Sequence, residues 1–246
     1  MSYSHLSFWY DAFMSHVDYT KWATYFERTC NMYGVQANRV LDLGCGTGEW
    51  LLEMHERGLT AVGVDLSEQM LAVAQAKLQE AGYQPLLYQG DMSDLPPVGS
   101  FDVVTIFCDS LNYLQDEDSV TRTFAACYNM LTKGGLLLFD VHSPTRMEAF
   151  PGEVHAQADE EVSYIWHSFA GEDPLSVVHE LTFFVRQQDG RYERLEEAHF
   201  ERTYTVEMYK EMLKQAGFAD LTVTADFTNE PPTSKSERLF FSCRKV

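Results

Sequence analysis

Short apolar runs alternate with longer amphipathic stretches between residues 39 and 141 of the chain. Each apolar run has the length of a buried strand, and the stretches between them space their apolar residues as a helix does. Because strands that alternate with helices pair in parallel through right-handed crossovers, we expect an α/β fold with a mostly parallel sheet. The predicted strands lie near 39–43, 60–64, 85–88, 101–107 and 135–141, and the predicted helices near 48–57, 67–81 and 118–131.

The second half of the chain has a different pattern. Three stretches rich in aromatic and β-branched residues predict a three-stranded antiparallel insertion, and they span 162–169, 175–188 and 192–204. Asp189-Gly190, between the last two, is typical of a hairpin turn. An amphipathic helix over 206–217 is expected next, and strands at 220–227 and 238–245 are expected to form an antiparallel hairpin at the end of the main sheet.

Near the N-terminus, residues 4–30 carry aromatic and apolar side chains at near-helical spacing, which predicts two short helices broken near Asp18. The whole pattern then divides the chain into three parts. They are an N-terminal helical segment of residues 1–36, a core of residues 37–142 and 205–246, and a β-rich insertion of residues 143–204.

A glycine-rich loop follows the first predicted strand, in the run VLDLGCGTG over residues 40–48. Glycine is needed where backbone turns sharply or lets a ligand lie against it, and a loop of this kind at a strand's carboxyl end is typical of a nucleotide pocket. A dinucleotide fingerprint would place its third glycine at Glu49, and Asp42 would repel a diphosphate. The loop therefore favours a ligand with a positive charge.

Further landmarks follow the loop in a fixed order. Asp65 ends the second strand and precedes Leu66 and Met70, and it lies 17 residues past Gly48, close to the spacing expected of a ribose-binding acid. The third landmark is the run QGDM over 89–92, and the fourth and fifth are the strands FDVVTIFC over 101–108 and LTKGGLLLFD over 131–140. In this order, over residues 38–142, the chain resembles the class I methyltransferases that use S-adenosylmethionine.

This resemblance implies a Rossmann-like class I methyltransferase sheet, S-adenosylmethionine as methyl donor and S-adenosylhomocysteine as product. In that family an acid after the second strand holds the ribose, apolar residues beyond it pack on the adenine, and helices that open with a Tyr-Asp pair close over the cofactor as a lid. The implied cofactor-binding residues are Tyr10, Asp42, Gly44, Cys45, Gly46, Gly48, Asp65, Leu66, Met70, Asp91, Met92 and Cys108.

Each acid also has a purely structural alternative. Asp42 is also suited to accept hydrogen bonds from backbone amides at the strand end. Asp65 is in position to cap a helix that begins near Ser67, since both residue types are favoured there. Asp91 is a common residue type in turns.

The methyl acceptor is expected next to the loop after the fourth strand, because the resemblance places substrate-facing groups there. Asp109, Asn112 and Tyr113 occupy that loop, His142 follows the fifth strand as the best-placed histidine for a base, and Arg202 ends the last insertion strand. Asn112 and Tyr113 are also suited to capping and packing, and His142 to a turn before Ser143-Pro144. The sequence assigns no catalytic residue.

Composition narrows the substrate class. The 246 residues carry 18 Lys and Arg against 37 Asp and Glu, a formal charge of −19, which disfavours nucleic acid and anionic membranes as partners. Between Glu153 and Glu211 there are 14 acidic and 5 basic residues. Such an excess usually marks a solvated face, and the sharper hypothesis is that it favours a cationic or neutral amine-bearing acceptor through long-range attraction. No apolar run reaches the roughly 18 residues that span a bilayer, and the N-terminus lacks a signal pattern, so we expect a cytoplasmic location.

Cysteine and histidine spacing predicts no metal site, since none of the five cysteines forms a C-x-x-C pair and the histidines of the insertion are widely separated. The sequence thus predicts methyl transfer from S-adenosylmethionine to an amine or hydroxyl of a small molecule. Two alternatives stay open, a non-catalytic module that binds S-adenosylmethionine and an NAD-dependent oxidoreductase. The oligomeric state is not predicted.

Overall fold

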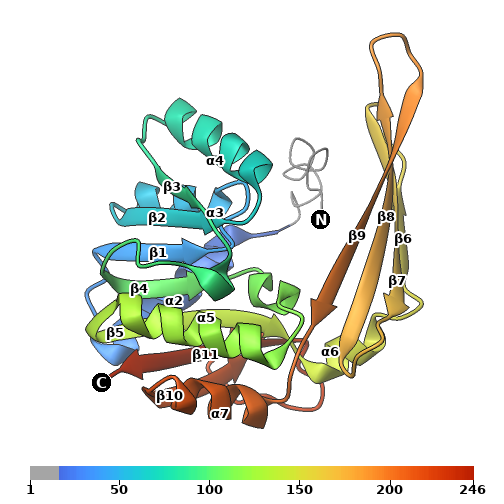
Figure 1. Cartoon of the computed structure of the whole chain (residues 1–246). Coiled ribbons are helices and arrows are strands. Elements are labelled where there is room, and N and C mark those ends of the chain that lie inside the picture. Colours follow the sequence, from blue (N-terminus) through green and yellow to red (C-terminus); the bar gives the residue numbers. More distant parts are fainter. Residues whose placement is uncertain (1–16) are drawn as a thin grey trace.

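The computed structural model describes residues 17–246, and a seven-stranded sheet forms its core (Figure 1). The strand order is β10-β11-β5-β4-β1-β2-β3, with β1 to β5 parallel, β11 antiparallel to β5 and β10 antiparallel to β11. The predicted Rossmann-like class I sheet with its C-terminal hairpin is therefore confirmed. Its strands are β1 (Arg39–Leu43), β2 (Thr60–Asp65), β3 (Leu86–Gln89), β4 (Phe101–Ile106), β5 (Leu131–His142), β10 (Phe218–Ala225) and β11 (Arg238–Lys245).

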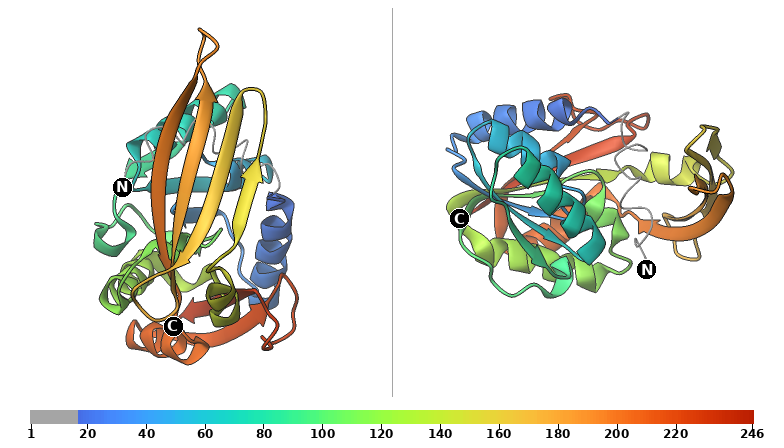
Figure 2. Two further views of the ribbon diagram at one scale, coloured as in Figure 1. Left: turned by 90° about the vertical axis from the view of Figure 1, so that its right-hand side faces the viewer. Right: turned by 90° about the horizontal axis from the view of Figure 1, so that it is seen from above.

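Helices cover both faces of this sheet (Figure 2). Val40 packs in one apolar cluster with residues of α2, α3 and α4, whereas its neighbour Leu41 packs in another with residues of α5 and α7. Successive side chains of a strand point to opposite faces, so the two clusters are the two sides of the sheet. The helices are α2 (Tyr19–Tyr33), α3 (Glu49–Glu56), α4 (Glu68–Glu80), α5 (Glu117–Met130), α6 (Pro144–Ala149) and α7 (Val206–Gln215), with short 3₁₀ turns η3 (Met92–Asp94) and η4 (Ser110–Tyr113).

The insertion is a second, antiparallel sheet that stands beside the core (Figures 1 and 2). It has four strands and not the predicted three: β6 (Val154–Gln157), β7 (Val162–Ala170), β8 (Ser176–Arg186) and β9 (Tyr192–Arg202). The sequence did not predict β6 because all four of its residues are exposed, and an exposed edge strand of this length has no apolar periodicity.

The N-terminal prediction is tested in part. Helix α2 begins after Asp18, which caps it by accepting a hydrogen bond from the Thr20 N–H at 3.2 Å, and this agrees with the expected break near Asp18. The first predicted helix and Tyr10 lie outside the described residues. Within residues 17–246, none of the helices is both long and apolar enough to cross a membrane, and the five cysteines are free thiols.

Candidate active site

The carboxyl ends of the parallel strands form one edge of the main sheet. The strand order reverses between β1 and β4, and in open α/β sheets a ligand binds at this reversal, outside the carboxyl ends. Asp42 and Asp65 lie in the last two residues of β1 and β2, while the glycine loop and the loop with Cys108 and Asp109 follow the ends of β1 and β4.

The glycine loop between β1 and α3 is held against the end of β2. The N–H groups of Gly44 and Cys45 both donate to the Val64 carbonyl, at 2.8 and 3.0 Å. A Cβ on Gly44 would lie 2.6 Å from the Cβ of Ser110, so glycine is required there by close packing. A Cβ on Gly46, where φ is +52°, would meet nothing within 4 Å. The loop is thus packed on one side and open at Gly46.

Asp65 fixes the open part of this loop. Its Oδ2 accepts from the Gly46 N–H and its Oδ1 from the Ser67 N–H, both at 2.8 Å. Burial raises the pKa of Asp65 above its usual value, while these backbone bonds act in the opposite direction. The cap of α4 is Ser67, whose hydroxyl accepts from the Met70 N–H at 3.2 Å. Asp65 therefore joins the loop to the end of β2 and is not itself the helix cap.

Asp42 is a buried carboxyl group at the end of β1. Its Oδ1 accepts a hydrogen bond from the Thr105 hydroxyl at 2.7 Å. Burial, together with the negative charges of Asp65 and Asp140, raises the pKa of Asp42 to about 8. A cation beside it would favour the ionised form, and a diphosphate would add to the repulsion. These carboxyl groups therefore fit the cationic amino-acid end of S-adenosylmethionine, with its ammonium and sulfonium, and do not fit NAD.

The residues predicted around the adenine come from the ends of β2 and β3. Leu66 is 59% exposed, and Met92 lies against Gly44, where an added Cβ would be 3.3 Å from its Cε. Asp91 is exposed and caps η3 by accepting from the Ser93 N–H and hydroxyl, both at 2.8 Å. Met70 is only 3% exposed, so it packs in the interior beneath α4 and offers little surface to a ligand.

The loop after β4 has a strained backbone held by a buried acid. Cys108 and Asp109 have φ of 54° and 55°, a region that residues other than glycine seldom adopt. Asp140 accepts from both of their N–H groups, at 2.9 and 3.1 Å, and from the Trp22 indole at 3.0 Å. Arg238 bonds Asp140 and also pairs with Asp109 at 2.8 Å. Strain of this kind is typical of functional loops.

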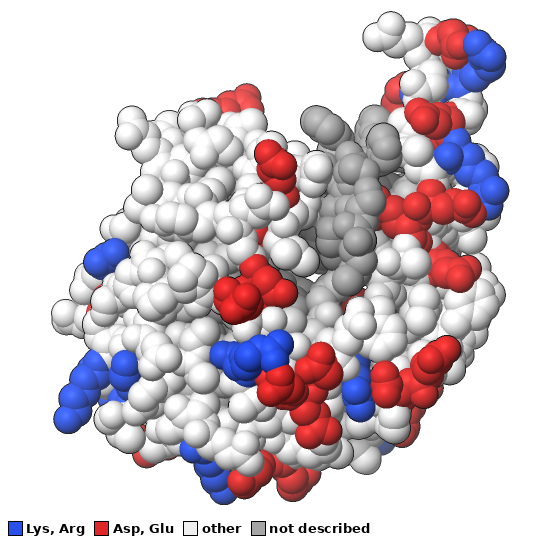
Figure 3. Space-filling view, viewed as in Figure 1, with Lys and Arg blue, Asp and Glu red and all other residues white. Residues whose placement is uncertain are grey.

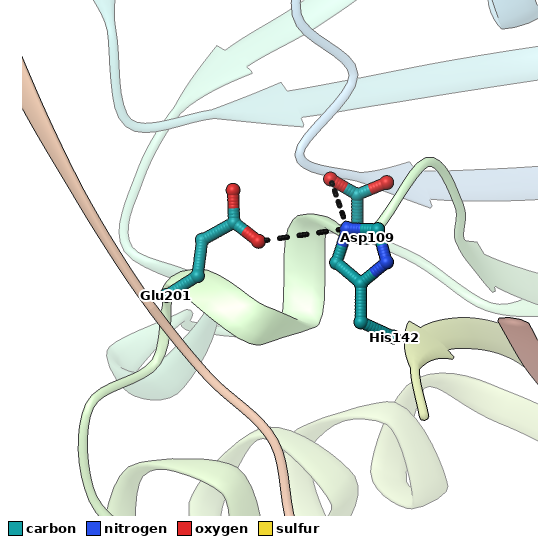
Figure 4. Close-up of side chains that lie close together, drawn as sticks. All are labelled: Asp109, His142 and Glu201. Atoms are coloured by element: carbon teal, nitrogen blue, oxygen red, sulfur yellow. Dashed lines mark ion pairs between the residues drawn. The ribbon is translucent and has the colours of Figure 1, made fainter. Parts of the chain in front are cut away.

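Three titratable side chains converge beside this loop (Figure 4). The Nε2 of His142, at the end of β5, lies 3.8 Å from the Oδ2 of Asp109 and 3.7 Å from the Oε2 of Glu201 on β9. Burial lowers the pKa of His142 to about 4, so its ring is neutral at pH 7. The three ligand-type atoms lie within 4.8 Å of one another. The sequence predicted Asp109 and His142 as site residues, but it did not predict Glu201.

The remaining predicted substrate-facing residues have other contacts. Asn112 is fully buried, donates to the Arg202 carbonyl at 2.7 Å and accepts from the His142 N–H at 3.0 Å, so it ties β5 to β9. Arg202 donates to the Gln115 carbonyl at 3.0 Å and pairs with Asp173 at 3.7 Å. Tyr113 lies edge-on to His199, with ring centroids 6.1 Å apart. Because side chains alternate along β9, Glu201 and not Arg202 lies beside His142.

Asp140, Arg238 and Trp22 are further site residues that the sequence did not indicate. Their partners are 31 to 129 positions away along the chain, and no local spacing marks such contacts. A sequence signal did exist for Glu201. Glu201 and Arg202 are neighbours on one strand and point to opposite faces of the sheet, so either of them could face the acceptor side. The predicted absence of a metal is not tested by this geometry.

Comparison with known proteins identifies the family. Residues 40–135 match the family described as a methyltransferase domain. Over 247 residues, which cover both proteins completely, the chain is 47% identical to a protein of Geobacillus sp. (strain WCH70) named "Putative methyltransferase". These matches decide against the nicotinamide-dependent oxidoreductase.

Solved structures agree. An S-adenosylmethionine-dependent methyltransferase from Clostridium acetobutylicum superposes with a TM-score of 0.86 at 29% identity and 96% coverage of both chains. A sugar N-methyltransferase from Streptoalloteichus sp. superposes with a TM-score of 0.80 at 26% identity, covering 96% of this chain and 92% of that one. The chain therefore belongs to the class I methyltransferase family and is an S-adenosylmethionine-dependent methyltransferase.

Proposed function

We propose that this enzyme methylates the nitrogen of a small amine-bearing molecule that binds between the loop after β4 and the β6–β9 sheet. One observation carries the proposal: carboxyl groups stand at the ends of β1 and β2 on both sides of an open glycine loop, and carboxyl groups stand again at the acceptor side. Such a site suits positive charge at both ends of the reaction.

At the cofactor side, Asp42 would face the amino-acid end of S-adenosylmethionine, and Gly44, Cys45, Gly46 and Gly48 would form its backbone cradle. Asp65 would hold the ribose hydroxyls, with Leu66 on the adenine face and Asp91 and Met92 at its edge. The backbone at Cys108 would lie near the methionine portion. When bound, S-adenosylmethionine supplies a methyl carbon already activated by the sulfonium.

The protein's part is then to align the acceptor and exclude water. Orientation of this kind supplies up to roughly 7–11 kcal/mol in ideal intramolecular systems. Asp109, held in place by Asp140 and Arg238, is proposed to orient the acceptor, with His142 beside it. A protonated amine needs only the loss of one proton to become a nucleophile, whereas a hydroxyl needs a stronger base.

Two observations favour an amine over a hydroxyl. The sugar N-methyltransferase has the same architecture across nearly all of this chain. Acidic side chains also gather along the insertion, on the face shown in Figure 3, and would attract a cationic amine.

The proposal is tested by turnover. The enzyme is incubated with S-adenosylmethionine and paired small molecules, amines and the alcohols of matching shape, and S-adenosylhomocysteine and methylated product are quantified by mass spectrometry. We expect product from amines at least tenfold faster than from their alcohol partners. Equal rates, or product from the alcohols alone, would contradict an amine acceptor.

A further inference from the structure

Glu201 is a buried acid whose charge has little compensation. It is 4% exposed, and among the residues that the structure describes none is hydrogen-bonded to its Oε2. Burial, together with the negative charge of Asp109, raises the pKa of Glu201 well above its usual value. An unbonded buried carboxyl group destabilises a fold, and acids with strongly shifted pKa values cluster at functional sites.

The unbonded oxygen points toward the proposed acceptor side. Oε2 lies 3.7 Å from the Nε2 of His142, and the same nitrogen lies 3.8 Å from Asp109 (Figure 4). The side chains of His142 and Asp109 keep 14% and 22% of their surface exposed, so this is the side of Glu201 that a small molecule reaches.

The other oxygen of Glu201 faces a hydrogen-bonded group of the insertion sheet. The Trp166 indole donates to the Nδ1 of His179 at 3.0 Å, and the Ser168 hydroxyl lies 2.8 Å from the same nitrogen. An indole N–H only donates, so Nδ1 carries no proton. Burial lowers the pKa of His179 to about 4, so the ring is neutral and its proton is on Nε2. That nitrogen faces the Oε1 of Glu201 at 3.8 Å.

We propose that Glu201 is the catalytic proton acceptor of the methyl transfer, and that His179 and Trp166 are positioning residues that hold it. This inference rests on the proposed amine methylation. One N–H proton of the protonated acceptor amine passes to Oε2 of the ionised Glu201, directly or through Nε2 of His142, which leaves a neutral nitrogen with a free lone pair. The nitrogen lone pair forms the bond to the methyl carbon as the carbon–sulfur bond breaks, and that electron pair stays on sulfur. The proton then leaves Glu201 for solvent.

The charged groups around Glu201 set the pH dependence. Asp109 from the loop after β4 opposes its ionisation and Arg238 from β11 favours it, while His142 from β5 and His179 from β8 are neutral. Only ionised Glu201 accepts a proton, so kcat/KM should keep rising with pH to values well above the usual pKa of a glutamate side chain. A divalent cation is less suited to the cluster, because Arg238 already pairs with Asp109 at 2.8 Å.

The first test compares Glu201→Gln with Glu196→Gln, an exposed acid on the same strand that pairs with Arg194. Glu201→Gln should lower kcat about 10²–10⁴-fold for the best amine and abolish the rise of kcat/KM with pH, with the affinity for S-adenosylmethionine unchanged. Glu196→Gln should match the wild type. Unchanged kcat and pH profile in Glu201→Gln would overturn the inference while leaving amine methylation intact.

A second measurement needs no acceptor. In infrared difference spectra at pH 7, the wild type should show a protonated carboxyl band that is missing from Glu201→Gln and kept in Glu196→Gln. Absence of that difference would overturn the inference.

Two activity assays complete the test. If EDTA abolished wild-type activity and added Mn²⁺ restored it, the cluster would bind a metal and the inference would be overturned. Trp166→Phe should move the rise of kcat/KM to higher pH, because His179 is freed to change tautomer. An unmoved profile would remove Trp166 and His179 from the account.

Discussion

The cofactor side and the acceptor side of this site are built in different ways. The cofactor side is mostly local: its predicted residues, apart from Tyr10 and Cys108, lie between residues 42 and 92. Asp65 and Asp91 accept from backbone N–H groups of that segment, and only Asp42 has a distant partner, Thr105. The acceptor side brings together Asp109, Asp140, His142, Glu201 and Arg238, which come from four strand ends and two sheets. A local site tolerates single changes with limited loss, whereas a buried charge network fails as a unit when one member is removed.

The largest difference between the two sides should appear on removing Arg238, which is the cation shared by Asp109 and Asp140. Arg238→Gln leaves two carboxyl groups without it, and we expect a loss of about 3–5 kcal/mol in the free energy of unfolding. Denaturant titration measures it. Arg186→Gln, which removes a partly exposed arginine paired with Glu160, is the control and should lose at most about 1 kcal/mol. Similar losses in both variants would show that the network is not cooperative.

On the cofactor side, Asp65→Ala should weaken S-adenosylmethionine binding by about 1–3 kcal/mol, through lost charge-assisted hydrogen bonds. Asp102→Ala is a matched control, because Asp102 also accepts from two backbone N–H groups, those of Asn38 and Arg39, each at 3.0 Å, but next to the start of β1. Calorimetric titration should find its affinity unchanged. Equal affinity in Asp65→Ala would remove the proposed ribose contact.

The pKa of Asp42 near 8 gives the cofactor side a pH dependence. The cationic ligand favours ionised Asp42, so affinity for S-adenosylmethionine should fall up to about tenfold per pH unit below pH 8, and Asp42→Asn should flatten this profile. The folded-state pKa lies above the unfolded one, so the stabilising contribution of Asp42 is present at low pH and lost as pH rises toward 8. Asp42→Asn should therefore raise the melting temperature at pH 8. A lowered one would contradict the burial argument.

The smallest expected effect is a difference in S-adenosylmethionine affinity between alanine variants of two glycines that have left-handed backbone. Gly46 and Gly58 have φ of +52° and +78°, and a Cβ on either would meet nothing within 4 Å. Replacing either with alanine should cost about 1 kcal/mol of stability. Only Gly46→Ala should also reduce S-adenosylmethionine affinity, because its methyl group would occupy the space proposed for the ligand. Equal affinities in the two variants would leave the open side of the loop without a ligand role.

Sequence reasoning succeeded where the physical cause is local. Strand and helix periodicity predicted the main sheet, and the N-caps Ser67 and Thr205 mark helix starts within a residue or two of those expected. It missed β6 because an exposed edge strand has no apolar pattern. Glu201 was missed because choosing between it and Arg202 requires the pairing of two sheets, which depends on contacts far apart in the chain.

A crystal structure with S-adenosylhomocysteine bound tests the account most directly. We expect the ribose hydroxyls within hydrogen-bonding distance of Asp65, roughly 3 Å, and the sulfur on the side of the glycine loop that faces Asp109 and Glu201. A nucleoside bound elsewhere, or bound at this edge without contact to Asp65, would contradict the site proposed at both ends of the reaction.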